Sequence, residues 1–535
     1  ILACGFSLVG CNSAKLLQVQ PLTNIHSTSK NSELTDTQMK RWGHLDLVKD
    51  TIPGMSVERA YDELLKKKKG QTVTVAVIDS GTSLDHEDLK DVLWVNLKEI
   101  AGDGVDNDGN GFVDDVHGYN FLGDSYHEQM EYSRIIRLKI GDQKLQQQAQ
   151  EAWEKELSET KEILPQLVQI EQFVQMAHRN ATEFMGTANY SIKDLENHQA
   201  KSLQEEQIVN LLIQIMGSGK NIPDALKEIQ YGIKQYQSRM DYNLNLEFDG
   251  RTPVGDDPYN IDDRNYGNGN PDVSVKDESH GTHVSGIIGA KRNNKKGING
   301  VADNIRLMSV RAVPDGDEYD KDVALAIRYA VDNGAKVINA SFGKAFSPNA
   351  EWVYDALKYA AEKDVLFVHA AGNEGMDLDL PENKNFPNDF GTGSTELFDN
   401  YLSVGALTAD FGQSMVAGFS NYGKRNVDIF APGDNIYSTT PGNEYEFKGG
   451  TSMAAPAVSG IAAVIRSHYP MLSAKQVKQI IMKSGIDINL SVQVGGMEGE
   501  IRQFSEISKS GKIANLYNAI LLAEKVSRSE VQLEN

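Results

Sequence analysis

The chain has 535 residues, of which 40% are apolar, and it carries a formal net charge of −22. The length and the apolar share allow a sizeable buried core, and the acidic balance argues against nucleic acid as a partner, because phosphate backbones are also negative. No apolar run reaches the roughly 18 residues that a membrane-spanning helix needs, so the sequence predicts no such span.

Both cysteines, Cys4 and Cys11, lie in the opening run ILACGFSLVGC, so the rest of the chain has neither a disulfide nor a cysteine zinc site. This run is typical of the end of a secretory signal peptide, and the four residues ending at Cys11 resemble a bacterial lipobox, in which the cysteine is lipidated. The run ending at Cys4 is a poorer candidate, and an ordinary signal peptide with incidental cysteines is the alternative. We therefore expect an exported protein of the bacterial cell envelope, an outer-membrane lipoprotein, with residues 1–36 as signal remnant, lipobox and tether.

Short β-branched runs alternate with helical patterns in most of the remaining sequence. This alternation predicts an α/β fold with a central, mostly parallel sheet and helices on both faces. The expected strands are 73–78, 336–342, 365–370 and 401–407, and the expected helices include 320–333, 350–363 and 512–526. Catalytic groups collect beyond the carboxyl ends of such strands, which is where Asp79, Ser341 and Asn373 fall.

Residues 125–248 interrupt this alternation. The segment is rich in Gln, Glu, Lys and Leu, with apolar residues at helical spacing, and it predicts two to four amphipathic helices divided at Pro165 and at the Gly-rich turn 217–219. It forms an inserted helical arm between the two parts of a catalytic domain, residues 37–124 and 249–535. The arm either limits access to the cleft or docks a partner, and a solvated spacer is the alternative.

Three short stretches carry the chemistry. Asp79 ends a predicted strand in the sequence DSG, His280 opens a helix in HGTHVSG, and Ser452 opens another in GTSMAAP. A serine hydroxyl needs a neighbouring base to become a nucleophile, histidine is the natural base near neutral pH, and a buried aspartate orients that histidine. Glycines beside Ser452 allow close approach of a substrate, and the start of a helix favours developing negative charge. His283 belongs either to a His-x-x-His metal pair or, as we expect, to the scaffold of the helix.

Taken together and in this order, the three stretches resemble those of the subtilisin-like serine peptidases. The resemblance covers about residues 72–122 and 255–485, and it implies a three-layer α/β sandwich and a serine endopeptidase that cleaves protein or peptide substrates with Asp79, His280 and Ser452. It also implies that Asn373, in the sequence AAGN, donates to the oxyanion. The residues that would bind the substrate are Ser341, Phe342, Gly343, Ala370, Ala371 and Gly372. Phe342 stands where the family usually has an aliphatic residue, which leaves the side-chain preference open.

A metal site is predicted where oxygen-bearing side chains alternate around a glycine turn, in the sequence DNDGNGFVDD. The spacing resembles the first half of an EF-hand loop, but the final glutamate is absent, so we expect a structural Ca²⁺ site and not a sensor. The expected ligands are Asp106, Asp108, Asn110, the Phe112 carbonyl, and one of Asp114 and Asp115. A surface turn rich in acids is the alternative, and no organic cofactor is expected.

Two other functions remain open at this stage. One is an inactive surface lipoprotein that uses a protease scaffold for binding, against which the complete set of catalytic residues argues. The other is a serine hydrolase that acts on esters, against which the peptide-pairing segment Ser341–Gly343 argues.

Overall fold

The computed structural model describes residues 33–533, except residues 67, 218, 274, 276, 277, 392 and 394. Cys4, Cys11 and most of the predicted tether lie outside the described residues, so lipidation at Cys11 stays a prediction. In the described part of the chain no helix is both long enough and apolar enough to cross a membrane.

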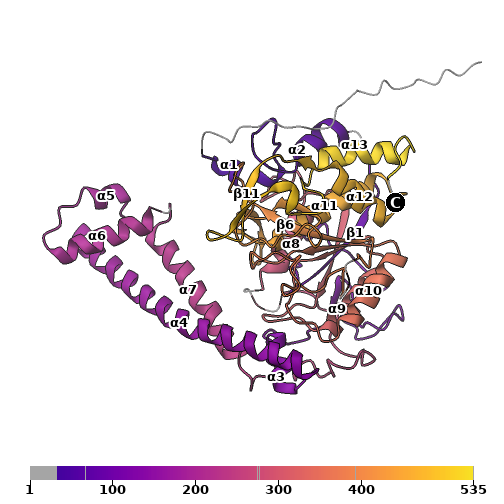
Figure 1. Ribbon diagram of the computed structural model, residues 1–535, viewed down its shortest axis with the longest axis horizontal. Coiled ribbons are helices and arrows are strands. Elements are labelled where there is room, and N and C mark those ends of the chain that lie inside the picture. The colour runs from indigo at the N-terminus through magenta and orange to yellow at the C-terminus, as the bar shows by residue number, and fades with distance from the viewer. Residues whose placement is uncertain are drawn as a thin grey trace, which may run out of the picture.

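A central sheet organises the described residues (Figure 1). Its nine strands follow the order β10-β13-β7-β6-β5-β4-β1-β3-β2, and the pairs from β13 to β2 are parallel, while β10 runs antiparallel to β13. The strands are β1 Val73–Asp79, β2 Gly118–Asn120, β3 Ile305–Arg311, β4 Val337–Ala340, β5 Leu366–Ala370, β6 Tyr401–Leu407, β7 Ile429–Pro432, β10 Ile486–Asp487 and β13 Lys512–Ile513. The mostly parallel sheet of the prediction is thereby confirmed.

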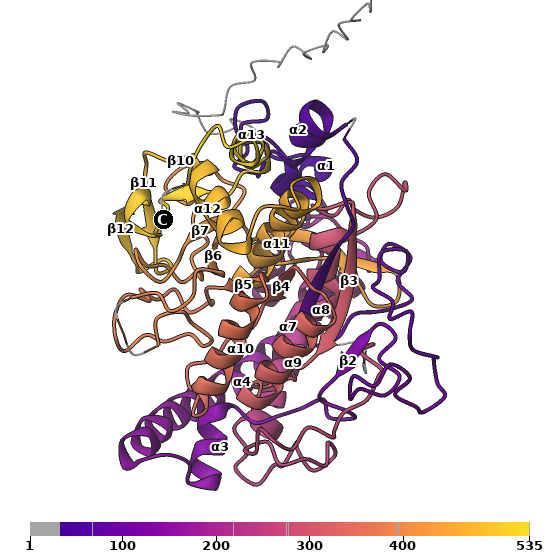
Figure 2. The same ribbon diagram turned by 90° about the vertical axis from the view of Figure 1, so that its right-hand side faces the viewer.

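Two helical layers cover the sheet, and the side-chain alternation of β1 shows how. Val73, Val75 and Val77 pack into one core with α2 Val57–Ala60, α8 His280–Gly289, α11 Thr451–His468, α12 Ala474–Ser484 and α13 Leu516–Ser527. Ala76 and Ile78 point the other way, into a second core with α9 Asp320–Asp332 and α10 Ala350–Glu362. Figure 2 shows these last two helices side by side. A strand with the two-residue period of a pleat thus joins both cores, which makes the fold a three-layer sandwich.

Smaller elements complete the catalytic domain. The helix α1 Asp36–Met39 and a 3₁₀ turn at Trp42–His44 precede α2, and two hairpins follow β7. The hairpins are β8 Ile436–Thr440 with β9 Glu444–Lys448, and β11 Ser491–Val494 with β12 Glu500–Gln503.

The inserted segment forms a projecting arm (Figure 1). Its elements are α3 Glu131–Leu138, α4 Gln143–Met185, α5 Ile192–Glu196, α6 Leu203–Met216 and α7 Ile222–Ser238. The far end of the arm has its own apolar cluster, which includes Val174, Leu195 and Leu212 and is separate from the cores of the catalytic domain. That separate cluster lets the far end of the arm fold without resting on the sheet.

One prediction about the arm is wrong: Pro165 does not divide it. Residues Gln143 to Met185 form one helix through Pro165, which is exposed. A proline inside a helix removes one backbone hydrogen bond, at a cost of about 3 kcal/mol, and long helices absorb this when neighbours hold them. Here α7 packs along α4, with Gln230 donating to Glu171 at 2.8 Å.

Buried charges join the base of the arm to the catalytic domain. Arg134 on α3 is fully buried and donates to Glu131 at 2.6 Å and to the Asp317 carbonyl at 2.8 Å. Lys344, which directly follows the predicted substrate-binding segment, lies 2.7 Å from the Glu131 carboxylate and 2.9 Å from that of Asp320. The arm therefore begins beside the segment Ser341–Gly343.

Candidate active site

Asp79 and His280 meet where β1 ends and α8 begins. His280 Nδ1 lies 2.8 Å from Asp79 Oδ1, and the Asp79 side chain is 2% exposed while that of His280 is 39% exposed. The same carboxylate oxygen accepts the Ser80 backbone N–H at 2.8 Å. Gly281 allows this approach, because a Cβ at that position would lie 2.1 Å from the Gly81 carbonyl oxygen. The buried Asp79 carboxylate thus holds the Nδ1 edge of the His280 ring, and the rest of this ring is accessible to solvent.

Ser452 lies in the first turn of α11, where backbone N–H groups have no partner within the helix. Its Oγ donates to the Ser341 carbonyl at 3.1 Å, and Ser341 Oγ donates back to the Ser452 carbonyl at 2.8 Å. Asn339 connects the two elements further, since its Nδ2 donates to Ser341 Oγ at 2.9 Å and its Oδ1 accepts from Ser459 Oγ at 2.8 Å. The start of α11 is therefore tied to the carboxyl end of β4.

Asn373 lies three residues beyond β5 and beside the start of α11. Its Oδ1 accepts the Thr451 N–H at 2.8 Å and the Thr451 hydroxyl at 3.0 Å, which directs Nδ2 away from the helix. A Cβ placed on Gly450 would lie 3.7 Å from Asn373 Nδ2 and 3.6 Å from Ser452 N. The Asn373 amide and the Ser452 N–H thus border the space that the missing Gly450 side chain leaves open.

The predicted substrate segments flank a side chain that sequence reasoning missed. Asn385 Nδ2 donates to the Ala370 carbonyl at 3.0 Å, and a Cβ on Gly343 would lie 2.2 Å from Asn385 Oδ1. Asn385 therefore fills part of the space between Ser341–Gly343 and Ala370–Gly372. Nothing in its local sequence marks it, because the loop that carries it reaches the site only in the folded chain.

A buried histidine supports the same region. His369 on β5 has its Nε2 2.7 Å from the Phe342 carbonyl oxygen and its Nδ1 2.8 Å from the Tyr401 hydroxyl. Burial lowers the pKa of His369 to about 4, so the ring is neutral near pH 7. It acts as a fixed donor to the Phe342 carbonyl.

His283 belongs to the scaffold and not to a metal pair. It is fully buried, and its Nε2 lies 3.0 Å from the Ile436 carbonyl and 3.1 Å from that of Glu446. Burial lowers its pKa to about 3. In the described part of the chain its ring thus links α8 to the β8–β9 hairpin.

The acidic loop collects part of the predicted ligand set and adds one residue to it. Carboxylate oxygens of Asp106, Asp108 and Glu99 lie within 4.8 Å of one another. Glu99 precedes the motif, so the EF-hand spacing could not reveal it; Asn110 stays next to the cluster, with its backbone N–H 3.1 Å from Asp108 Oδ1.

The other predicted ligands have different neighbours. Asp114 accepts the backbone N–H groups of residues 102–104, and Asp115 is buried against Asn96, Asn110 and Tyr329. The ring of Phe112 packs edge-on against Tyr119 and Tyr329, which anchors the loop to the core.

Comparison with known proteins agrees with this geometry. The family model described as the subtilase family (Peptidase S8) matches residues 70–503. The chain belongs to the subtilase family, whose members include subtilisin-like serine proteases.

Three curated relatives illustrate the extent of the similarity. A thermophilic serine proteinase of Bacillus sp. (strain AK1) is 40% identical over 191 residues, which are 36% of this chain and 43% of the relative. Subtilisin-like protease 2 of Plasmodium falciparum is 32% identical over 311 residues, 56% of this chain and 21% of the relative. Subtilisin DY of Bacillus licheniformis is 34% identical over 251 residues, 46% of this chain and 79% of the relative. The match thus spans less than half the length of the first two.

The low pKa of His369 predicts a pH dependence of stability. An unfolded histidine has a pKa near 6.5, so the unfolded chain binds more protons between about pH 6.5 and 4, and the stability that neutral His369 contributes is lost as the pH falls through this window. In urea titrations from pH 7 to 4, we expect the native protein to lose roughly 3 kcal/mol relative to His369→Phe, which has no titrating ring.

Tyr401→Phe is the matched control, because it removes the hydroxyl partner of His369 and leaves the imidazole in place. It should keep the native slope of stability against pH. Parallel curves for the native protein and His369→Phe would contradict the prediction.

Proposed function

We propose that the chain is a serine endopeptidase that hydrolyses peptide bonds through an acyl-enzyme. The observation that carries the proposal is the 2.8 Å contact between His280 Nδ1 and buried Asp79, at the same sheet edge as Ser452 at the start of α11. Membership of the subtilase family supports it independently. Protein or peptide segments are the proposed substrates.

In the proposed mechanism, Asp79 holds the proton of His280 on Nδ1 and leaves Nε2 as the base. The resting hydroxyl of Ser452 donates to the Ser341 carbonyl and has to leave it before His280 can accept the proton. An extended substrate that pairs with the Ser341–Gly343 backbone competes for this carbonyl and so frees the hydroxyl. Ser452 Oγ then attacks the substrate carbonyl, and protonated His280 gives the proton to the amine as the C–N bond breaks and the acyl-enzyme forms. A water molecule that loses a proton to His280 then attacks the acyl-enzyme, and the acid leaves as His280 returns the proton to Ser452 Oγ.

Negative charge on the tetrahedral intermediate is proposed to be stabilised by the Ser452 N–H and the Asn373 amide. Their common position around Gly450 supports this role, and the start of α11 adds a favourable dipole. Because the N–H and the hydroxyl of Thr451 already donate to Asn373 Oδ1, the Asn373 amide is oriented before the substrate binds. Preorganised donors of this kind need no rearrangement as the charge develops.

Substitutions at Ser452 and Asn373 test the mechanism. Ser452→Ala should abolish both cleavage of a chromogenic peptide and labelling by a fluorophosphonate probe, since it removes the nucleophile. Asn373→Ala should lower kcat about 10²- to 10³-fold with little change in KM, because the oxyanion forms only in the transition state.

Asn333→Ala at the end of α9 serves as the control and should keep the native kcat. Residual cleavage by Ser452→Ala, or an unchanged kcat in Asn373→Ala, would count against the proposed roles. If the native chain is labelled and hydrolyses esters but does not cleave peptides, the esterase alternative is favoured. If the native chain shows no activity and no labelling in any assay, the inactive binding protein is favoured.

A structural Ca²⁺ ion is proposed for the acidic loop. The cluster of Glu99, Asp106 and Asp108 supports it, because a cation would relieve the repulsion that remains between these carboxylates beside the backbone N–H groups they accept. Ca²⁺ takes six to eight oxygen ligands at about 2.3–2.6 Å. The ion would hold the loop against the core that Phe112 enters, and it takes no part in the proposed chemistry.

Removal of the ion should therefore destabilise the protein. A chelator should lower Tm of the native chain, since a ligand at about 100 times its Kd stabilises by ~2.7 kcal/mol. Glu99→Gln combined with Asp106→Asn should lower Tm to a similar extent and abolish the response to added Ca²⁺. Asp103→Asn in the same loop should retain that response, and an identical Tm with and without chelator in the native chain would contradict the proposal.

The arm is proposed to control which substrates reach the cleft. Support comes from its base, because Lys344 connects Glu131 on α3 directly to the segment Ser341–Gly343. Phe346, two residues further on, packs against Tyr132 of α3 with ring centroids 6.2 Å apart. An element anchored at this point can exclude large substrates while short peptides pass.

A truncated arm tests this role. Leu167 and Gly232 are neighbours across α4 and α7, so a four-residue Gly/Ser turn in place of residues 168–231 removes the far end and keeps the base. We expect native kcat/KM on a short peptide and a changed rate on a folded protein substrate. Unchanged rates on both substrates would support the spacer alternative.

A further inference from the structure

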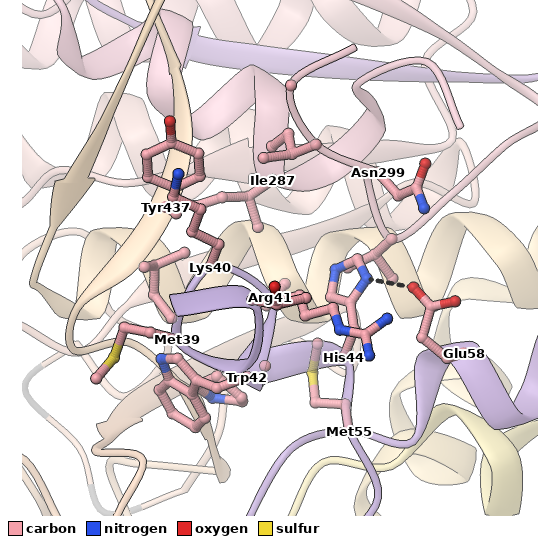
Figure 3. Close-up of a pocket in the computed structure, with 18 of the residues that line it drawn as sticks. Met39, Lys40, Arg41, Trp42, His44, Met55, Glu58, Ile287, Asn299 and Tyr437 are labelled. Carbon is pink, nitrogen blue, oxygen red and sulfur yellow. Dashed lines mark ion pairs between the residues drawn. The ribbon is translucent and has the colours of Figure 1, made fainter. Parts of the chain in front are cut away.

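A cavity of about 660 Å³ lies behind the catalytic helices, between the N-terminal segment and the rest of the domain. Residues 37–58 form one wall, the loop 293–301 forms another, and α8 and α11 form the floor (Figure 3). This volume is within the range of about 300–1,000 Å³ that small-molecule sites occupy. The proposed mechanism makes no use of this cavity, which we call the N-terminal cavity.

The N-terminal cavity is basic although the chain as a whole is strongly acidic. Lys40, Arg41, Lys295 and Lys296 line it, and Glu58 is the single carboxylate that lines it among the described residues. Glu58 is already engaged, with His44 Nδ1 at 3.6 Å and Arg292 at 3.7 Å.

Three of these cations form no ion pair in the described part of the chain, although, after the hydrogen bond from His44, the charge of Arg41 also helps to lower the pKa of Glu58. Lys296 pairs with Glu87 at 2.9 Å, whereas Lys40 lies over the Tyr437 ring at 4.9 Å, and Arg41 and Lys295 have no ion pair there. Figure 3 shows both side chains along the wall of the cavity, with Lys40 ending beside Tyr437 and Arg41 ending beside His44. Three exposed cations around one mouth favour an anionic group, because an anion there gains charge-assisted hydrogen bonds without displacing an existing ion pair.

The deeper surface of the N-terminal cavity is apolar. Met39 is half-buried and lines the accessible part of the wall, whereas Met55, Ile287, Met453 and Ala457 are buried and close the inner end. Methionine side chains are flexible and polarisable, so they adapt to ligands of different shape. The cavity therefore combines an apolar floor with a cationic mouth, which matches an elongated apolar molecule with one anionic end.

We propose that the N-terminal cavity binds a small apolar molecule that ends in one carboxylate, either a fatty-acyl acid or the free carboxyl terminus of an apolar peptide. The carboxylate lies between Lys40 and Arg41, and the apolar part points toward Ile287 and Met453, which are 6% and 2% exposed and close the inner end of the cavity. Both of these residues belong to the helices that carry His280 and Ser452, and Met453 is the residue next to the nucleophile. An occupant therefore lies next to the two helices that carry His280 and Ser452.

Binding is measured on the full-length Ser452→Ala chain, so that the result does not depend on catalysis. Isothermal titration calorimetry is carried out with decanoate and with methyl decanoate, which has the same acyl chain and no charge. A second pair is an apolar pentapeptide with a free carboxyl terminus and the same peptide with an amide terminus. We expect saturable one-site binding of at least one carboxylate, with its uncharged counterpart about tenfold weaker or more.

Variants assign the site. Lys40→Ala with Arg41→Ala should weaken binding of the carboxylate about tenfold or more and leave Tm unchanged, since both side chains are exposed. Met39→Glu, at a half-buried position on the wall, should abolish binding by placing a carboxylate in the cavity. Lys358→Ala with Lys363→Ala, on α10 and just after it, is the matched control for loss of two positive charges and should bind as the parent chain does.

The two ligand pairs distinguish a fatty-acyl acid from a peptide carboxyl terminus as the natural ligand. Binding of decanoate alone identifies a fatty-acyl acid, and binding of the peptide alone identifies a peptide terminus. The proposal is overturned if no carboxylate binds, if the charged and uncharged ligands bind equally, or if the Lys40/Arg41 variant binds like the control.

Discussion

The candidate active site depends on one reciprocal contact, in which Ser452 and Ser341 exchange hydrogen bonds between the start of α11 and the end of β4. Asn339 and Ser459 extend this contact into the core, and Asn373 caps Thr451 from the neighbouring strand β5. A helix whose first turn is held by two strands cannot shift without breaking several buried hydrogen bonds. Ser452, the segment Ser341–Gly343 and Asn373 therefore keep fixed relative positions, as the proposed catalysis by preorganised dipoles requires.

The same sheet edge also explains how distant parts of the chain can influence this site. Lys344, directly after the substrate segment, is the buried cation that joins the base of the arm to the catalytic domain. On the other side, Ile287 and Met453 carry the floor of the N-terminal cavity on the two catalytic helices. The inserted arm and the N-terminal cavity thus both adjoin the elements of the candidate site, although neither supplies a residue of the proposed triad.

Prediction from the sequence succeeded where the signal is local. The run that ends at Asp79 was found because β-branched and apolar residues follow one another without interruption, and the strand Tyr401–Leu407 was found although Ser403 and Gly405 interrupt its apolar residues. Prediction failed at Pro165, because packing of α7 along α4 outweighs the cost of a proline, and such packing has no local signal. Glu99 and Asn385 were missed for a related reason, since each reaches its site through a loop whose path the local pattern does not define.

The sequence by itself determined the fold class, through the alternation of strand and helix patterns, and it supplied the proposed triad, through three short stretches with their own helix-start and strand-end signals. Only the tertiary structure decided which acidic residues gather in the acidic loop, what fills the space beside Gly343, and that Lys40, Arg41 and Lys295 meet at the mouth of a cavity behind Ser452. The physical reason is the range of the interactions. Backbone propensity and side-chain period act over a few residues, whereas burial and charge pairing depend on contacts between segments hundreds of positions apart.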